Sequence, residues 1–358
     1  MNIGEAAETY AWIKLSLDGV IVGAKSDLAP WPAKTWKVCS VGRVSSGKLV
    51  ELTVNGDDTV ITIGSGSART VHTDGVRELA TWLQSRLVGG KWTTADTSKL
   101  NADMTALFRG ALKGGGGGKA DILPLVEEPI QSFIRVARRG LSVKSSSGAD
   151  PSLVNASKHT RFRFSVQNAL LGAEADTPSQ LLHALGHANV GFEGVRSESY
   201  EHNLAIVDSH LAEMLAWMLV ESFSTRTTSI SELCQRLTSA NPLMLRSTPN
   251  YRRKIGEFLV ASALGMVPAT KWTGAYAADG GMLVVKQAGE LVTFFVIDAE
   301  LKDSMSAYLL NTCCLDTAST KRHEFGELYS EGKIDYLDLA LQVRLKMPKK
   351  SAKPKKKS

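Results

Sequence analysis

The stretch that decides the fold is GGGGGKADILPLVEEPIQSFIRVARRGLSVKS, residues 114–145. After the glycine run, KADILPLVEE and RRGLSVKS each predict a strand, and the connection between them passes through Pro129. We expect the two segments to form a hairpin with Asp121 at the start of one strand and Lys144 on the other. The glycine run lacks the GK[ST] ending of a phosphate-binding loop, so a flexible connector is its alternative reading.

An acid at the start of one strand and a Ser-Val-Lys triplet on the next are typical of metal-dependent nucleases. Phosphodiester cleavage needs a divalent cation, and a carboxylate must hold that cation near the scissile phosphate, so Asp121 is the candidate ligand. A nearby lysine can orient or deprotonate the attacking water, which makes Lys144 the candidate for that role. The alternative is structural, with Asp121 capping a turn and Lys144 in solvent.

The position two before the lysine is usually a second acid in such sites, whereas this chain has Ser142. A hydroxyl is a weak metal ligand, so a neighbouring acid has to supply the missing carboxylate. Three acids are nearest in sequence and stay open as candidates: Glu127, Glu128 and Asp150.

Outward from this centre, residues 1–75 predict an N-terminal β module, because short β-branched runs alternate there with the turn segments SSGK and NGDD. Residues 76–346 follow as the main domain. Its helical patterns cluster in an insertion at about 177–265, in which residues 201–223 predict one long helix. Its last hundred residues return to strands, with a hairpin over the QAGE turn. We therefore expect an α/β fold with a mixed central sheet and a helical subdomain.

Composition places the chain among ordinary globular proteins. Of its 358 residues 43% are hydrophobic and 22% charged, and four cysteines without CxxC spacing argue against a disulfide scaffold. We expect no membrane partner and a cytoplasmic location, because no apolar run reaches the roughly 20 residues of a membrane span and the N-terminus does not resemble a signal peptide.

The net charge of +6 comes from the C-terminus. The segment 346–358 carries seven lysines and no acid, which leaves 35 basic against 36 acidic residues elsewhere. Residues 347–358 are therefore predicted to be a disordered Lys-rich tail, and DNA binding by the rest of the chain has to come from local patches.

Two polar segments have side chains suited to nucleic acid. In both, Arg and Lys can pair with guanine, and Ser, Thr and Asn can hold phosphates, although each segment is also compatible with a plain polar loop. The candidate contacts in the first segment are Asn155, Ser157, Lys158, Thr160 and Arg161. Those in the second are Ser319, Lys321, Arg322 and His323.

A zinc hydrolase is a competing hypothesis. His183 and His187 are four residues apart in LLHALGHA, so on one helix they would share a face. The segment has no HExxH glutamate, and no third ligand is near.

Taken together, several phrases in the same order resemble the HpaII family of type II restriction endonucleases. The resemblance covers about residues 114–346. The phrases are GGGGGKADI, GLSVKSSSG with LVNASKHTRF, NLAIVDSHL, ANPL, ALGMVPATKWTGAY with ADGGMLVVK, and TASTKRHEFGELY.

This resemblance implies a PD-(D/E)XK-type nuclease that hydrolyses double-stranded DNA with Mg²⁺ at a short palindrome, CCGG in the namesake, and leaves 5′-phosphate ends. Asp121 matches the metal-binding acid, Ser142 the degenerate second position and Lys144 the lysine. A cognate DNA methyltransferase is implied as a functional partner, and a homodimer is compatible with a palindromic site. Two alternatives remain: a DNA-binding protein with a decayed nuclease site, and a nuclease of different or modification-dependent specificity.

Overall fold

The computed structural model describes residues 2–66, 68–108, 120–130, 133–169, 175, 177–246, 250–316, 326 and 328–347. The chain forms two compact units, each described by itself below. Unit 1 comprises residues 1–150, 277–305 and 347–358, and unit 2 comprises residues 151–276 and 306–346.

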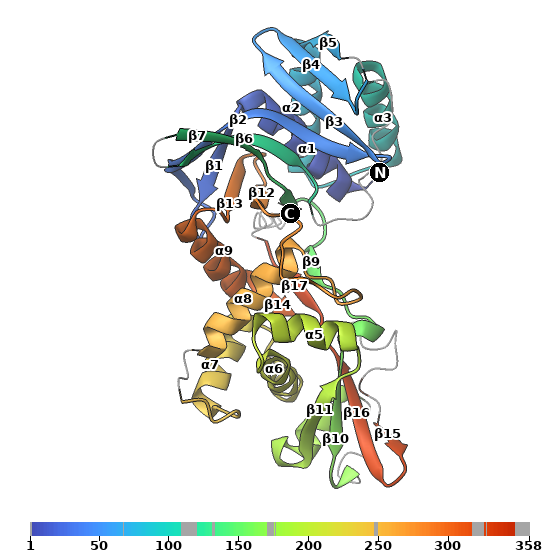
Figure 1. Ribbon diagram of the computed structural model, residues 1–358. Helices are drawn as coiled ribbons and strands as arrows, with labels where there is room; N and C mark the ends of the chain where they lie inside the picture. The colour runs from blue at the N-terminus through green and yellow to red at the C-terminus, as the bar shows by residue number, and fades with distance from the viewer. Residues whose placement is uncertain are drawn as a thin grey trace, which may run out of the picture. The chain divides into compact units, whose positions relative to one another are not determined.

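Unit 1 combines a large sheet with three helices from the N-terminal part of the chain (Figure 1). Its helices are α1 (Ile3–Asp18), α2 (Thr73–Gly89) and α3 (Thr94–Phe108). Its strands are β1 (Val20–Ala24), β2 (Pro30–Ser45), β3 (Lys48–Asn55), β4 (Asp58–Ile63), β5 (Arg69–His72), β6 (Leu123–Ile130), β7 (Phe133–Arg138), β8 (Leu141–Ser145), β12 (Gly281–Val285) and β13 (Leu291–Phe295).

These strands form one mixed sheet in the described part of the chain. The order is β5-β4-β3-β2-β1-β13-β12-β8, and β6 pairs with both β2 and β7. The β1–β13 and β12–β8 pairs are parallel, while the other pairs are antiparallel. Strand β8 therefore joins the N-terminal strands through β12 and β13, which come more than 130 residues later in the chain.

Helix α1 was not predicted from the sequence, yet its ends are well defined. Asn2 and Glu5 form a reciprocal capping box at its start, and Gly19 ends it at φ 64°. The indole ring of Trp12 on this helix is fully buried, and its Nε1–H donates a hydrogen bond to the Val41 carbonyl (2.9 Å). The helix packs against β2, β3 and β8, so it forms the core between the sheet and α2.

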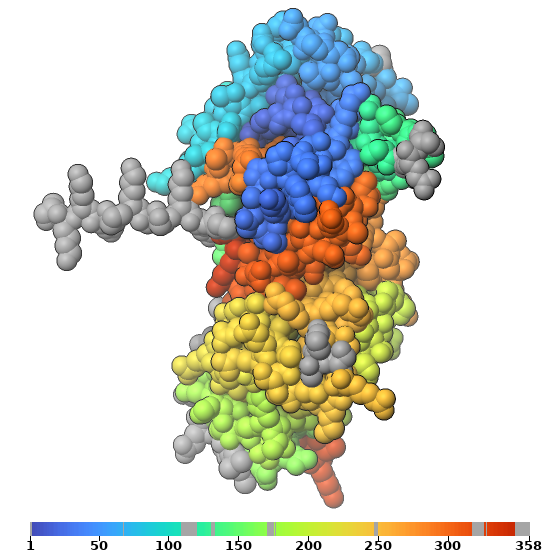
Figure 2. All heavy atoms as spheres, turned by 90° about the vertical axis from the view of Figure 1, so that its left-hand side faces the viewer, coloured from blue at the N-terminus to red at the C-terminus, as the bar shows by residue number. Residues whose placement is uncertain are grey.

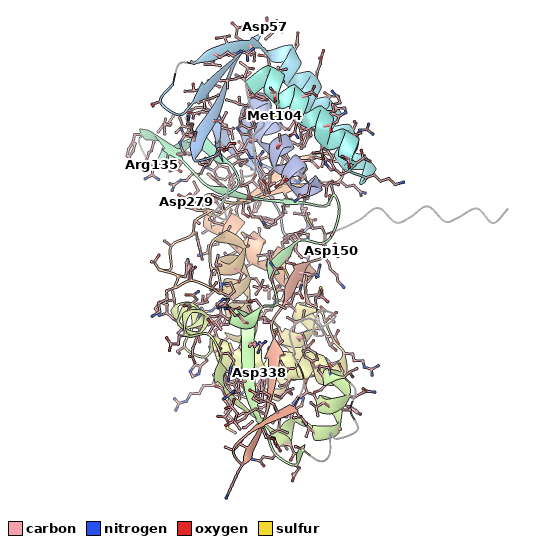
Figure 3. All side chains as sticks on the ribbon, turned by 90° about the vertical axis from the view of Figure 1, so that its right-hand side faces the viewer. Asp57, Met104, Arg135, Asp150, Asp279 and Asp338 are labelled. Atoms are coloured by element: carbon pink, nitrogen blue, oxygen red, sulfur yellow. The ribbon has the colours of Figure 1, made fainter. Side chains whose placement is uncertain are left out.

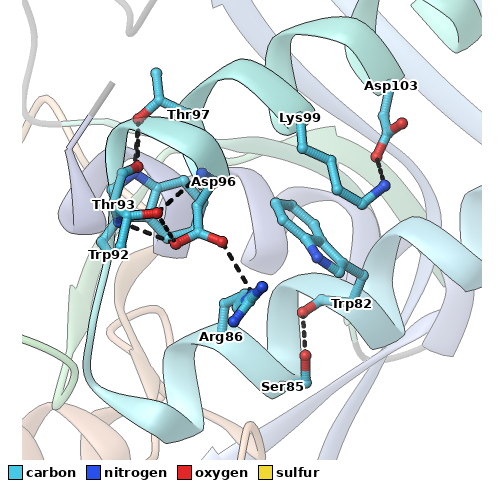
Figure 4. Close-up of polar contacts among 9 residues, drawn as sticks. All are labelled: Trp82, Ser85, Arg86, Trp92, Thr93, Asp96, Thr97, Lys99 and Asp103. Carbon is cyan, nitrogen blue, oxygen red and sulfur yellow. Dashed lines mark hydrogen bonds and ion pairs between the residues drawn. The ribbon is translucent and has the colours of Figure 1, made fainter.

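A polar cluster joins α2 to α3 (Figure 4). The Asp96 carboxylate accepts hydrogen bonds from the Thr93 hydroxyl (2.7 Å) and the Thr93 main-chain N–H (2.9 Å), and it pairs with Arg86 of α2 at 2.9 Å. The hydrogen bond from the Thr93 hydroxyl holds the pKa of Asp96 below its usual value. Asp96 thus starts α3 and ties it to the preceding helix.

Unit 2 contains two smaller sheets and most of the helices (Figure 1). Its strands are β9 (Ser152–Val154), β10 (Arg161–Val166), β11 (Val190–Val195), β14 (Cys313–Leu315), β15 (Leu328–Glu331), β16 (Ile334–Ala340) and β17 (Val343–Leu345). Its α-helices are α4 (Pro178–Leu185), α5 (Glu198–Val207), α6 (Leu211–Thr225), α7 (Ile230–Ala240) and α8 (Asn250–Leu264), with 3₁₀ turns at Lys158–Thr160 and His187–Asn189, while α9 (Ala299–Thr312) begins in unit 1 and ends in unit 2.

The four-stranded sheet has the antiparallel order β11-β10-β16-β15, and the three-stranded sheet the order β14-β17-β9. Helices α7 and α8 pack against each other and form the yellow and amber surface in Figure 2. In the part of the chain that the structure describes, no single helix is long and apolar enough to cross a membrane; α5 and α6 reach that length only as a pair bent by 105°.

The mixed sheet and the β12–β13 hairpin confirm the sequence prediction of a mixed α/β fold. The hairpin expected for residues 119–145 is wrong in its pairing, because an extra strand, β7, lies between its halves and pairs with β6. Strand β8 pairs with β12 instead, and only a single antiparallel bridge, Ile122 with Leu141, links it to the β6 segment. The segment 201–223, expected to be one long helix, is divided into α5 and α6.

Candidate active site

The triplet on β8 presents Ser142 and Lys144 on the same face of the strand, because alternate residues of a strand share a side. Ser142 is fully buried and Lys144 is partly exposed. The Lys144 ammonium donates to the Ser142 hydroxyl (2.9 Å) and to the Val143 carbonyl (3.2 Å). Ser142 therefore fixes the lysine in place.

Asp121 lies against this strand just before β6 begins. Its main-chain N–H donates to the Leu141 carbonyl (2.9 Å), and its Oδ2 accepts a hydrogen bond from the Val143 N–H (2.6 Å). A carboxylate that accepts from a main-chain amide is held in one orientation. The structure thus brings Asp121, Ser142 and Lys144 together, although they come from segments that do not form a hairpin.

Glu8 on helix α1 is the acid that the sequence reading missed. Helix α1 packs against β8, and Glu8 interacts electrostatically with both Asp121 and Lys144. Burial raises the pKa of the Glu8 carboxyl to about 7, and the negative charge of Asp121 adds to that rise. The available sequence signal was the capping box of Asn2 and Glu5, which marks a helix start three residues before Glu8.

Arg43 on β2 holds Glu8 in position. Its side chain is 1% exposed, and its guanidinium donates to Glu8 Oε2 (3.1 Å) and to the Thr9 hydroxyl (2.6 Å). Burial lowers the pKa of Arg43, and the negative charges of Glu8 and Asp121 oppose that effect. Glu8, Asp121, Arg43 and Lys144 therefore form one electrostatically coupled group at this site.

The donor set fits Mg²⁺. Among the described residues, no group of three His, Cys, Asp or Glu side chains could hold a metal ion. Mg²⁺ commonly takes one or two carboxylates and completes its shell with water and substrate phosphate oxygens. Glu8 and Asp121 provide that number of carboxylates next to a lysine.

The acids proposed from sequence as the second ligand have other partners. Glu127 pairs with Lys37 at 2.6 Å, and buried Glu128 pairs with Arg135 and Arg139. Asp150 ends the first segment of unit 1, five residues beyond the end of β8 (Figure 3). Glu8 is therefore better placed than these three acids to act with Asp121.

The first polar segment lies between β9 and β10 in unit 2. The Ser157 hydroxyl accepts from the His159 N–H (3.2 Å), and the buried Thr160 hydroxyl bonds to main-chain groups of the same turn. Asn155 and Lys158 are exposed, and Arg161 opens β10. Thr160 thus shapes the turn, whereas Asn155 and Lys158 are accessible to a ligand.

The second polar segment lies outside the described residues, including Ser319, Lys321, Arg322 and His323. Its neighbours on both sides are described. Asp316 donates its N–H to the Gln342 carbonyl (3.1 Å), and Gly326 donates its N–H to the Asp338 carbonyl (2.8 Å). Both ends of the segment are therefore attached to the part of the chain that contains β16.

The two histidines of the zinc hypothesis do not share a helix. Helix α4 ends at Leu185, Gly186 follows at φ 67°, and His187 begins a separate 3₁₀ turn. The Nε2 atom of His187 lies 3.6 Å from Oε2 of Glu221. No metal-binding group of three side chains is found here or elsewhere in the described residues. The expectation that His183 and His187 share a helix face is wrong, because the chain turns at Gly186.

Comparison with known proteins adds independent information. A family model described as HpaII restriction endonuclease matches residues 2–345. The type II restriction enzyme HpaII of Haemophilus parainfluenzae is 28% identical over 359 residues, covering 96% of this chain and 98% of that enzyme. No solved structure matches the chain. The similarity extends beyond residues 114–346 and includes helix α1 with Glu8.

Proposed function

Because this chain belongs to the HpaII restriction endonuclease family and is a type II restriction enzyme, we propose that Glu8, Asp121 and Lys144 form its catalytic centre. We propose that the centre is of the PD-(D/E)XK type and hydrolyses double-stranded DNA at a short palindrome, leaving 5′-phosphate ends. CCGG is the first sequence to test. The observation that carries this proposal is the meeting of these side chains, from α1, the start of β6 and β8, in one place.

Each residue has a distinct part in the proposed reaction. Glu8 and Asp121 would hold Mg²⁺, which when bound would activate water and offset the charge that develops on the phosphate. The Val143 amide orients Asp121, and Arg43 orients Glu8. Lys144, held by the Ser142 hydroxyl, places a positive charge beside the carboxylates, where it can position the attacking water.

The partners follow from the substrate. A palindrome presents the same half-site twice, so we propose that two copies of the chain act on one site. The host genome contains the same sequence, so a cognate DNA methyltransferase has to protect it. Of the residues predicted to contact DNA in the first polar segment, we retain Asn155, Ser157, Lys158 and Arg161, and leave out Thr160 because its hydroxyl is bonded within the turn and its side chain is fully buried.

The test is digestion of unmethylated phage DNA by the full chain with Mg²⁺, with EDTA as the control, followed by sequencing of the cut ends. We expect discrete fragments with 5′-phosphates and one common sequence at the ends. Binding without cutting would favour the decayed nuclease. Cutting of methylated but not unmethylated DNA would favour the modification-dependent alternative.

A further inference from the structure

The four-stranded sheet of unit 2 has two different faces. Phe162, Phe164, Leu337 and Leu339 are fully buried on one face. The alternate residues of the same strands are Arg161 and Arg163 on β10, and Tyr336 and Asp338 on β16. The register places Arg163 opposite Asp338, so an acid and several basic or aromatic side chains share the second face.

Asp338 is the centre of this face (Figure 3). Its side chain is only 6% exposed, and its Oδ1 accepts a hydrogen bond from the Tyr329 hydroxyl (3.0 Å). Three arginines surround the carboxylate. The distance from the nearest guanidinium nitrogen to a carboxylate oxygen of Asp338 is 3.9 Å for Arg161, 3.9 Å for Arg163 and 3.8 Å for Arg196. One buried carboxylate thus faces three guanidinium groups.

Arg163 already has close partners. Its two terminal nitrogens donate to Glu331 (3.0 and 2.5 Å), and its guanidinium lies 4.5 Å from the ring centre of Tyr336 and 5.5 Å from that of Tyr329. These contacts fix Arg163 within the sheet. Its role is therefore structural.

Arg196 also approaches Asp338 through Nε, but it differs from Arg163 because its side chain is 40% exposed rather than 17%. The main-chain N–H of Arg196 donates to the Arg161 carbonyl (2.9 Å), which places the two arginines side by side. Among the described residues, Asp338 is the carboxylate paired with Arg196. The terminal nitrogens of Arg196 are therefore available to a ligand with two acceptors.

The exposed guanidinium of Arg196 favours an anionic or acceptor-rich partner. The Arg196 side chain is 40% exposed, whereas that of Arg163 is 17% exposed and is paired with Glu331. A phosphate contact needs only a flexible positive charge, which lysine supplies equally well. A guanine edge needs a planar fork in a fixed orientation, and a buried carboxylate behind the arginine provides that orientation.

We propose that Arg196, oriented together with Arg161 by Asp338, reads a guanine in the DNA substrate. This inference rests on the proposed function and adds Arg196 as a specificity-determining residue and Asp338 as a positioning residue. Gly326, which follows the second polar segment, donates to the main-chain carbonyl of the same Asp338.

The first experiment compares cleavage of the cut sequence with cleavage of single-mismatch duplexes at fixed salt. Arg196→Ala should lower the cognate-to-mismatch ratio of kcat/KM by roughly 5- to 150-fold, which corresponds to about 1–3 kcal/mol for a bidentate arginine–guanine pair. Arg196→Lys should not restore the ratio, because lysine lacks the fork. Asp338→Asn should lower the ratio as well, with kcat affected less than specificity.

The matched control is Arg236→Ala, which removes an exposed, ion-paired arginine from α7 of the same unit. It should leave the ratio unchanged. Thermal unfolding of each variant identifies any that fail to fold. If Asp338→Asn unfolds, Arg196→Ala still decides the question, because Arg196 is largely at the surface.

The second experiment distinguishes the guanine edge from the phosphate backbone. Duplexes with 7-deazaguanine lack the N7 acceptor, and binding is measured with EDTA so that it does not depend on cleavage. Wild type should lose affinity for the substituted duplex, whereas Arg196→Ala should bind both duplexes equally. Equal losses in the two proteins, or an unchanged cleavage ratio in Arg196→Ala, would overturn the inference. Failure of wild type to cut any DNA would instead reject the proposed function.

Discussion

At the scale of single residues, Asp121 accepts a hydrogen bond from the Val143 amide, which holds its carboxylate beside the strand that carries Ser142 and Lys144. We expect Asp121→Ala to lower the cleavage rate by several orders of magnitude and to leave DNA affinity within a few-fold of wild type, because the carboxylate serves the metal. Single-turnover cleavage and anisotropy measure the two effects.

Glu127→Ala is the control for Asp121, since it removes an acid that pairs with Lys37 on the same sheet. It should remain active. A variant of Asp121 that keeps a tenth of wild-type turnover would exclude this residue from the site.

Glu8 offers a similarly direct test. Glu8→Gln keeps the size of the side chain and removes its charge, so we expect a loss of more than about 100-fold in cleavage rate that higher Mg²⁺ concentration partly restores. Glu5→Gln on the same helix is the control, because glutamine also completes a capping box. If the two variants lose activity equally, α1 contributes stability and not a ligand.

Variants of Lys144 and Ser142 distinguish the residue that acts in catalysis from the residue that positions it. Lys144→Ala should eliminate turnover. Ser142→Ala should remove only the hydrogen bond that positions the ammonium and leave substantial activity, because a serine hydroxyl is a poor metal ligand. The comparison needs kcat for both variants at saturating Mg²⁺. Equal inactivity of the two would mean that the Ser142 hydroxyl is itself essential.

At the scale of secondary structure, Gly281 determines how closely β12 can lie beside β13. It has φ 121°, and a Cβ atom there would lie 2.0 Å from the Phe294 carbonyl oxygen. We expect Gly281→Ala to lower the free energy of unfolding by more than about 2 kcal/mol, through backbone strain and this clash. Urea denaturation measures the change.

The control is Gly47→Ala in the turn between β2 and β3. Gly47 also has positive φ, at 75°, but a Cβ atom there would meet nothing within 4 Å. Gly47→Ala should lower the free energy of unfolding by only about 1 kcal/mol. Equal costs at the two positions would show that the Phe294 contact does not matter.

The elements that the sequence predicted correctly have local signals. The β12–β13 hairpin has a short, nearly continuous apolar run on each side of the QAGE turn. The break between α5 and α6 was missed because it contains neither Gly nor Pro. There Asp208 accepts a hydrogen bond from the His210 N–H (2.9 Å), and this Asx turn ends the helix while the apolar pattern continues.

The candidate site could be predicted only in part for a different reason. Asp121, Ser142 and Lys144 lie within one short segment, so their pattern is visible in the sequence. Glu8 lies more than 110 residues earlier, and nothing in its local sequence indicates that α1 packs against β8. Ion pairs such as Glu127 with Lys37 also depend on tertiary pairing, which sequence proximity does not show.

At the scale of the whole molecule, the basic charge is concentrated at the C-terminus. Truncation after Met347 removes six of the seven lysines of residues 346–358, which lie mostly outside the described residues. Each phosphate contact releases counterions, so we expect the truncated enzyme to show a shallower dependence of log affinity on log salt and an unchanged cleavage site. Titrations between 50 and 200 mM salt, about a fourfold range over which such contacts matter, provide the measurement. A new cleavage site would contradict this passive role.

The sheet order of unit 1 also has a consequence for biosynthesis. In the sheet, strand β8 reaches β1 through β12 and β13, and β13 ends at Phe295. One bridge, between Leu141 and Ile122, also links β8 to the β6 segment. At about 5–20 residues per second, the ribosome needs roughly 8–30 s to proceed from Lys144 to Phe295. During that time the nascent chain already contains Glu8, Asp121 and Lys144 but lacks the neighbours of its catalytic strand. A chain released early by a premature stop codon would therefore carry the proposed catalytic residues without the sheet that assembles them, and the host chromosome would be spared.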